Sequence, residues 1–226
     1  MLRKRAYDKL LTCYLDRGKL QRPEDRQHRG RIVDARTNKL LCGSVCGGME
    51  LEEFKSRYPC EDIVVEESVD GTLINMFWHQ GAWQLSTKKC PNAFRAYWAS
   101  DKSFGELFME AIEPSLQRDL LRKNNSYSFV LQHVESRNVV PVPRNRVYHV
   151  ATYDCTIQKY IQCSVGIPQP FQYQPFRSYD DVVRFASEMP FWREGVMLYS
   201  PDRQERCKIQ GKRFVHVKGV KGNCHD

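Results

Sequence analysis

The chain has 226 residues, of which 41% are hydrophobic and 27% charged, and it carries a formal net charge of +8. These proportions are those of a soluble globular protein with one sizeable core or two small ones, and no apolar run is long enough to span a bilayer. Residues 1–5 are basic, but a charged amphipathic stretch follows where a signal peptide would have an apolar core. We therefore expect no membrane association and an intracellular location, in the cytoplasm or the nucleus.

The excess of positive charge favours polyanionic partners, with nucleic acid first among them, over a basic surface that is merely solvated. The nine cysteines are an odd number, and no two have Cys-x-x-Cys spacing. Cys42 and Cys46 lie four residues apart without a matching second pair, so a zinc site is only weakly indicated. Reduced thiols, several of them buried, are the favoured interpretation.

The N-terminal part of the chain predicts short elements joined by polar turns. Apolar residues at helical spacing predict a helix over residues 6–16, and the polar, basic residues 17–30 are expected to form a loop. Residues 31–34 and 39–42 flank a polar turn, which predicts a hairpin. Residues 50–57 are expected to form a short helix.

Two further turns and two helix starts can be located. One apolar strand leads into the turn Asp70-Gly71, a second leaves it, and Gln80-Gly81 precedes a third strand at residues 83–87. Residues 103–106 have the pattern of a capping box, and the helix they start runs toward residue 121 with an interruption at a proline. Ser178 is expected to cap a second helix that runs to about residue 189. The remaining strands are predicted at residues 127–134, 147–153, 196–199, 207–210 and 214–217.

Strands dominate this pattern, helices are few and hairpin connections are frequent. The pattern predicts an α+β fold built on antiparallel sheet with a few flanking helices. Residues 167–176, rich in proline, glutamine and aromatic residues, are the best internal boundary, and we expect them to form a loop within one domain. We therefore predict a single domain over residues 1–226.

Five segments, in order, resemble motifs of the ATP-dependent RNA ligases of the bacteriophage type (RNA ligase 1-like). The second of them, Ser68-Val69-Asp70-Gly71, stands where the ligase and capping-enzyme superfamily carries Lys-x-Asp-Gly. The others are Arg29-Gly30-Arg31-Ile32-Val33-Asp34, Ser86-Thr87-Lys88-Lys89-Cys90, Phe129 to Val140, and Glu194-Gly195-Val196-Met197 together with Lys208-Ile209-Gln210. The resemblance covers about residues 26–218, and five motifs in order are far more specific than any one alone.

The resemblance implies an antiparallel-sheet nucleotidyltransferase domain of the ligase, capping-enzyme and ATP-grasp-like kind, with ATP and Mg²⁺ as cofactors and RNA as the partner. The nucleotide-binding positions that it implies are Arg29, Asp70, Gly71, Lys88, Gln132, Glu194 and Lys208. The metal ligands stay unknown. Family ligases carry a further C-terminal domain that selects RNA, and only residues 219–226 follow the last motif here. A protein partner is therefore expected to supply that function.

Three departures from the family motifs concern catalytic positions. Ser68 replaces the nucleophilic lysine, Gln132 the glutamate that serves the ribose, and Gln210 the second lysine of the last motif. A desolvated lysine becomes a nucleophile, and the last-motif lysines stabilise the transferring phosphate. Serine has no evident neighbouring base in the sequence, and its phosphoester would be less activated than a phosphoramidate. We therefore predict a catalytically degenerate site in which Ser68 occupies the nucleophile position and is inactive.

Three hypotheses of function follow. The first is a degenerate RNA-ligase-like protein, a pseudoenzyme, that binds RNA ends, nucleotide or both. The second is an active RNA ligase of the repair type that uses a displaced lysine, with Lys88 or Lys89 as candidates. The third is a structural or interaction protein that keeps only the fold. Short, diverged ligase-like proteins are associated with viruses or mobile elements, and a virus-encoded protein that acts in the host cell is one expectation.

Overall fold

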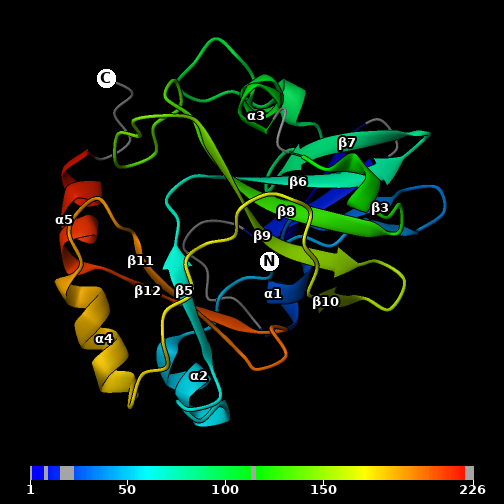
Figure 1. Ribbon diagram of the computed structural model, residues 1–226. Helices are drawn as coiled ribbons and strands as arrows, with labels where there is room; N and C mark the ends of the chain where they lie inside the picture. The colour runs from blue at the N-terminus through cyan, green and yellow to red at the C-terminus, as the bar shows by residue number, and fades with distance from the viewer. Residues whose placement is uncertain (1, 8–9, 16–22, 113–115, 222–226) are drawn as a thin grey trace. The chain divides into compact units, whose positions relative to one another are not determined.

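The computed structural model describes residues 2–7, 10–15, 23–112 and 116–221 (Figure 1). The chain divides into two compact units. Unit 1 comprises Met1–Gly47, Thr72–Ser136 and Pro143–Gln169, and unit 2 comprises Gly48–Gly71, Arg137–Val142 and Pro170–Asp226. The chain passes repeatedly from one unit to the other. One crossing follows Gly71 directly, and another lies within residues 167–176.

Unit 1 contains two antiparallel sheets. The first has the order β1 (Leu2–Tyr7), β2 (Leu10–Leu15), β3 (Ile32–Asp34), β4 (Leu40–Cys42). The second has the order β10 (Lys159–Ile161), β9 (Arg146–Asp154), β8 (Asn125–Gln132), β6 (Thr72–His79), β7 (Ala82–Thr87). Sequence-adjacent strands pair in most of these positions, as short hairpin connections require.

The two predicted hairpins of unit 1 are confirmed, and local chemistry accounts for both. In the β3–β4 turn, Asp34 Oδ1 accepts the backbone N–H groups of Arg36 and Thr37 at 2.8 and 3.1 Å. In the β6–β7 turn, Gln80 and Gly81 have φ of 50° and 80°, the left-handed conformation of a two-residue hairpin loop. The twist of this β6–β7 turn matches the twist of the two strands that it joins.

The core of unit 1 lies between the five-stranded sheet and α3 (Phe104–Ile112). Phe129 on β8 packs against Phe108 on α3 with ring centroids 5.4 Å apart. The predicted capping box starts this helix, because Ser103 N donates to the Glu106 carboxylate at 2.7 Å and Glu106 N donates back to Ser103 Oγ at 3.3 Å. The helix ends at Ile112, and residues 113–115 lie outside the described residues. In the described remainder of the predicted range there is one short 3₁₀ turn, η2 (Arg118–Leu120). A second 3₁₀ turn, η1 (Ala93–Arg95), precedes α3.

Unit 2 is built on one antiparallel sheet with the order β12 (Arg206–Gln210), β11 (Gly195–Tyr199), β5 (Val64–Ser68). Its helices are α2 (Leu51–Arg57), α4 (Tyr179–Glu188) and α5 (Lys212–Lys221). One face of the sheet is apolar and packs with Phe54, Val182 and Ala186 in a buried core. As predicted, Ser178 caps α4 by accepting the Asp181 N–H at 3.2 Å.

The structure corrects several predicted elements. The helix expected over residues 6–16 is wrong, because its described residues belong to the antiparallel strands β1 and β2; residues 8, 9 and 16 lie outside the described residues. Residues 214–217 belong to helix α5 and not to a strand. The expected loop at residues 17–30 contains helix α1 (Pro23–His28), and residues 17–22 lie outside the described residues. The strands on either side of Asp70-Gly71 do not pair with each other, because β5 pairs with β11 while β6 pairs with β7 and β8.

The predicted fold class is confirmed, since all named strand pairs are antiparallel and five helices accompany the three sheets in the described residues. The eight cysteines described are all free thiols. Within the described segments, no helix has both the length and the apolar character that crossing a membrane requires.

Candidate functional site

Glu194 in unit 2 is the centre of a polar cluster on the sheet face opposite the apolar core. In the strand register, Ser68 of β5 and Gln210 of β12 flank Gly195 of β11 on either side. Gly195 has φ of 142°, and a Cβ added there would lie 2.1 Å from the Ile209 carbonyl oxygen. Only glycine fits this position. It leaves a gap in the row of side chains, and the Glu194 carboxylate bridges Ser68 and Gln210.

Three side chains donate to this carboxylate. Ser68 Oγ donates to Glu194 Oε2 at 2.8 Å, while Gln210 Nε2 and Lys208 Nζ contact Oε1 at 2.8 and 2.9 Å. Ser68 and Glu194 are 4% and 8% exposed, and the Lys208 side chain is partly open to solvent. The ion pair is therefore more than a surface contact, because one partner is buried and hydrogen-bonded from both sides.

The partner of Ser68 differs from the sequence expectation. The sequence indicates no base beside the serine, yet the Glu194 carboxylate lies within direct hydrogen-bond distance of its hydroxyl. Glu194 is 126 residues away in the chain, so no local pattern indicates the pair. The same carboxylate also neutralises Lys208, so removal of the Ser68 proton would compete with an existing ion pair.

Asp70 holds a backbone loop. Its Oδ2 accepts the N–H groups of Val139 and Val140 at 2.9 and 3.3 Å. Burial raises the pKa of Asp70 above its ordinary value, and the nearby Glu194 charge adds to the shift, while the two backbone bonds and Lys208 oppose it. Asp70 therefore fixes residues 137–142 next to the turn at Gly71.

Lys221 is a residue of this region that sequence analysis missed. Its Nζ donates to the carbonyl oxygens of Arg137 and Asn138, in the same loop that Asp70 holds. Desolvation and the neighbouring Arg137 lower the pKa of Lys221, and Asp70 opposes the shift. The basic residues near the C-terminus are the one signal in the sequence that points to this lysine. No helix was predicted there, because residues 214–217 were expected to form a strand.

The other predicted nucleotide-binding residues lie in unit 1. Gly30, next to Arg29, has φ of 76°, and a Cβ there would lie 2.9 Å from Ser44 Oγ and 3.6 Å from the Lys88 Cα. The Arg29-Gly30 turn and the Lys88 segment are thus neighbours. Gln132 ends β8 and pairs with Arg146 of β9, which lines a cavity of about 430 Å³ together with Arg144. Sites for small molecules have volumes of this order.

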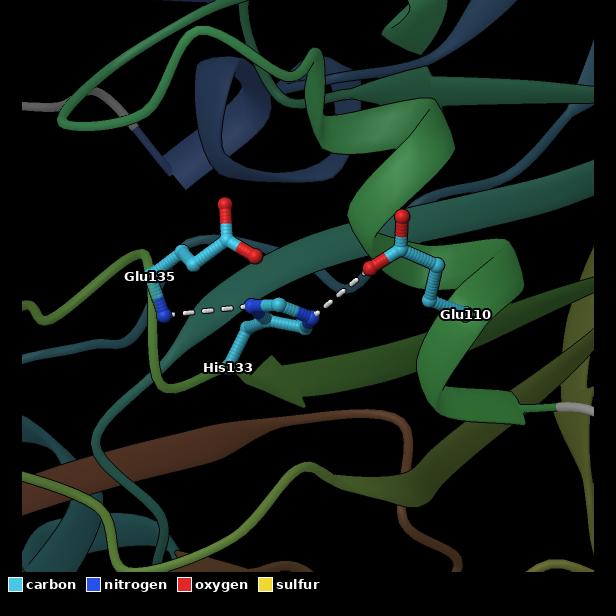
Figure 2. A group of neighbouring side chains, drawn as sticks. All are labelled: Glu110, His133 and Glu135. Atoms are coloured by element: carbon cyan, nitrogen blue, oxygen red, sulfur yellow. Dashed lines mark hydrogen bonds and ion pairs between the residues drawn. The ribbon is translucent and has the colours of Figure 1, made fainter.

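A second polar cluster in unit 1 contains Glu110, His133 and Glu135 (Figure 2). His133 is 1% exposed, and its Nδ1 accepts the Glu135 backbone N–H at 3.2 Å. The other ring nitrogen, Nε2, lies 3.4 Å from the Glu110 carboxylate and 2.8 Å from Asn145 Nδ2. Both ring nitrogens of His133 therefore already have polar partners within the protein.

A cation is already present in this second cluster. Lys102 Nζ lies 3.1 Å from the Glu110 carboxylate and 2.8 Å from Glu135 Oε1. The pKa of Lys102 is raised by these hydrogen bonds, and that of Glu135 is lowered in return. Although the ligand types would suit a divalent ion, the cluster is arranged as an ion-pair network around lysine.

No family model matches the chain. It is 23% identical over 207 residues to an "Immediate-early protein ICP-46 homolog" of Invertebrate iridescent virus 6, covering 76% of this chain and 43% of that protein. It is 22% identical over 222 residues to a "Putative bifunctional polynucleotide kinase/RNA ligase" of Autographa californica nuclear polyhedrosis virus, covering 85% and 32%. The chain spans less than half the length of these curated relatives.

A solved structure decides the fold. A mutant of Naegleria gruberi RNA ligase with ATP and Mn superposes with a TM-score of 0.58 at 10% identity, covering 79% of this chain and 58% of that one. The chain has the fold of an RNA-ligase nucleotidyltransferase domain. This RNA-ligase-like fold confirms the resemblance that the five ordered motifs predicted. The assignment of individual site residues stays a prediction.

Proposed function

We propose that this RNA-ligase-like chain binds RNA ends, nucleotide or both, and forms no covalent nucleotide intermediate at Ser68. The hydrogen bond between Ser68 and Glu194 carries the proposal. The nucleophile position holds a neutral hydroxyl that is engaged by a carboxylate, and this carboxylate is in turn engaged by Lys208 and Gln210. An unprotonated amine, which nucleotidyl transfer of this class requires, is absent from that position.

The distribution of charge supports RNA as the partner. Unit 1 carries 22 of the 35 lysines and arginines but only 12 of the 27 acidic residues, which leaves 13 and 15 for unit 2. The positive charge of the chain is therefore concentrated in unit 1, where Arg29 and Lys88 are neighbours. A cationic surface of this kind supplies the salt-sensitive part of nucleic-acid binding. The Naegleria structure is that of an RNA ligase, which supports the same partner.

Nucleotide binding is proposed at the Glu194 cluster, where Lys208 would face a phosphate. The residues fit a divalent metal ion poorly. Glu194 Oε1 already accepts from Lys208 and Gln210, so both of its lone pairs are engaged, and Oε2 accepts from Ser68. Because the Glu194 oxygens are already engaged, these residues favour nucleotide binding without a preformed Mg²⁺ site.

A second candidate function is active ligation through a displaced lysine. Lys88 and Lys89 are the candidates that the motifs imply. Lys208 belongs to the same cluster as Ser68, because its Nζ contacts the same carboxylate as the Ser68 hydroxyl. A covalent nucleotide on Lys88, Lys89 or Lys208 would establish this function.

The named relatives come from an iridovirus and a baculovirus. We infer that the chain is virus-encoded and acts inside the host cell. Since it matches less than half of each relative, we also infer that selection of the RNA substrate depends on a further domain or a partner protein.

Binding of a 5′-phosphorylated RNA oligonucleotide at two salt concentrations, about 50 and about 200 mM, tests the proposal. We expect RNA binding that weakens steeply with salt, and no mass gain on the protein after incubation with ATP and Mg²⁺. Absence of both RNA and nucleotide binding would contradict the proposal and favour a protein that keeps only the fold.

A further inference from the structure

The turn at residues 190–193 of unit 2 presents two large aromatic side chains to solvent. Phe191 and Trp192 are 45% and 60% exposed, and their ring centroids lie 5.1 Å apart in an edge-to-face arrangement. Because the rings are largely exposed, the turn is held by hydrogen bonds and not by burial of the rings. Arg193 N donates to the Pro190 carbonyl at 3.0 Å, and the Arg193 guanidinium donates to Tyr173 Oη at 3.0 Å. We call residues 190–193 the aromatic turn.

Helix α5 lies next in space and is strongly basic. The chain has no acidic residue from Arg206 to Lys221. Lys212, Arg213 and Lys218 are exposed, and none of the three has an ion pair with another residue that the structure describes. Their charges are therefore available to an anionic partner.

The aromatic turn and α5 adjoin each other. Gly211, which precedes α5, donates its N–H to the Glu194 carbonyl at 2.9 Å, and a Cβ on Gly211 would lie 3.8 Å from the Arg193 carbonyl oxygen. Figure 1 shows the same neighbourhood, with α4 and α5 in contact. The backbone of the aromatic turn thus adjoins the start of α5, which carries Lys212 and Arg213.

We propose that the aromatic turn and α5 form a binding surface for single-stranded RNA. Unpaired bases stack on Trp192 and Phe191, and the phosphates contact Lys212 and Arg213. Aromatic side chains accept any unpaired base on their faces, whereas bases within a duplex expose no free face. The inference rests on the proposed function and adds where the strand lies and in which form it binds.

The position of Trp192 explains why this surface suits the end of a strand. Trp192 precedes Glu194 by two residues, a span of at most about 7 Å. The aromatic turn therefore leads directly into the Glu194 cluster, and the end of a strand bound on the turn can reach that cluster.

The surrounding charge distinguishes RNA from a protein partner. Protein–protein interfaces surround their aromatic residues with apolar groups and are depleted in lysine. Here Arg193 directly follows the rings in the chain and lies 4.0 Å from Glu67, while Lys212 and Arg213 begin α5, which carries no acidic residue. A polyanion matches this pattern and an apolar protein surface does not.

Fluorescence anisotropy with a 5′-labelled single-stranded RNA tests the proposal on the full chain. We expect Trp192→Ala to weaken binding about 5- to 150-fold, the loss that corresponds to one base stack. Trp192→Phe keeps a ring and should retain most of the affinity. Trp98 of unit 1 is 47% exposed, so Trp98→Ala is the matched control and should bind within about twofold of the natural chain. Lys212→Gln should weaken binding and reduce its salt dependence by about one phosphate contact.

The outcomes that overturn the inference can be told apart from those that also overturn the proposed function. If the natural chain binds RNA with salt sensitivity and Trp192→Ala binds equally well, the proposed function stands and this surface is wrong. The same conclusion follows if duplex RNA competes as well as single-stranded RNA, or if Trp192→Ala instead abolishes capture of a defined protein. If the natural chain has no affinity for RNA, both proposals fail together.

Discussion

The Ser68 hydroxyl donates to the Glu194 carboxylate over 2.8 Å, across neighbouring strands of one sheet. By their resemblance to the family motifs, Ser68 stands at the nucleophile position and Glu194 begins the motif Glu194-Gly195-Val196-Met197. The structure joins them by a hydrogen bond. This pairing connects the loss of the lysine to a stable local network, because the serine satisfies a buried carboxylate that would otherwise lack a donor on that side.

Gly195→Ala tests the conformation that creates the network. The added Cβ would lie 2.1 Å from the Ile209 carbonyl oxygen, and φ of 142° is strained for alanine. We expect a loss of about 2–5 kcal/mol in the free energy of unfolding, measured by chemical denaturation. Gly81→Ala is the matched control, since Gly81 also has a positive φ of 80° but nothing lies within 4 Å of its Cβ position. A loss at Gly195 no larger than at Gly81 would show that the close approach to Ile209 is not a constraint.

The local elements were predictable because their determinants are adjacent in sequence. Ser103 with Glu106, Ser178 with Asp181, and Gln80 with Gly81 each act within a few residues. Residues 6–16 misled the prediction, because residues four apart share one face of a strand as well as one face of a helix. On β2 the burial alternates, with Leu10 and Thr12 buried and Leu11 and Cys13 half-buried. Residues 214–217 alternate like a strand, but only Phe214 is buried, and the helix that contains them packs along α4.

The site was predictable only as far as the motif resemblance extends. That resemblance selected Ser68, Asp70, Glu194 and Lys208, which the structure brings together in unit 2. It assigned no role to Lys221 or to the aromatic turn, because each depends on contacts between segments far apart in sequence. Gly71 follows Asp70 in the same unit, whereas Arg29, Lys88 and Gln132 lie in unit 1.

His149 makes the stability of unit 1 dependent on pH. It is buried beside the rings of Phe129 and Tyr127, and burial lowers its pKa from 6.5 to about 4. The folded protein therefore keeps His149 neutral while the unfolded chain binds a proton below pH 6.5, so stability falls as the pH drops from about 6.5 to about 4. The total is on the order of 3 kcal/mol. Denaturation at several pH values should show this slope, and His149→Gln should flatten it; an unchanged slope in the variant would assign the effect to other groups.

Lys102→Ala should convert the second polar cluster, formed by Glu110, His133 and Glu135, into a weak site for divalent ions. In the natural chain the Lys102 ammonium bridges the two carboxylates, so Mn²⁺ should not raise the Tm. Removing the lysine leaves two neighbouring carboxylates that a divalent ion can bridge, and Mn²⁺ should then raise the Tm. Lys55→Ala, which breaks the exposed pair with Glu52, is the control and should show no such gain. Stabilisation of the natural chain by Mn²⁺ at this cluster would contradict the assignment.

The most direct test of the central claim is the intact mass of the protein after incubation with ATP and Mg²⁺, for the natural chain and for Ser68→Lys. We predict no mass gain on the natural chain. On the variant we predict the gain of one nucleoside monophosphate, because the variant restores an amine beside a retained Glu194 and Lys208. Ser68→Ala should behave like the natural chain. A nucleotide adduct on the natural protein, mapped to Lys208, Lys88 or any other residue, would contradict the account and establish an active nucleotidyltransferase.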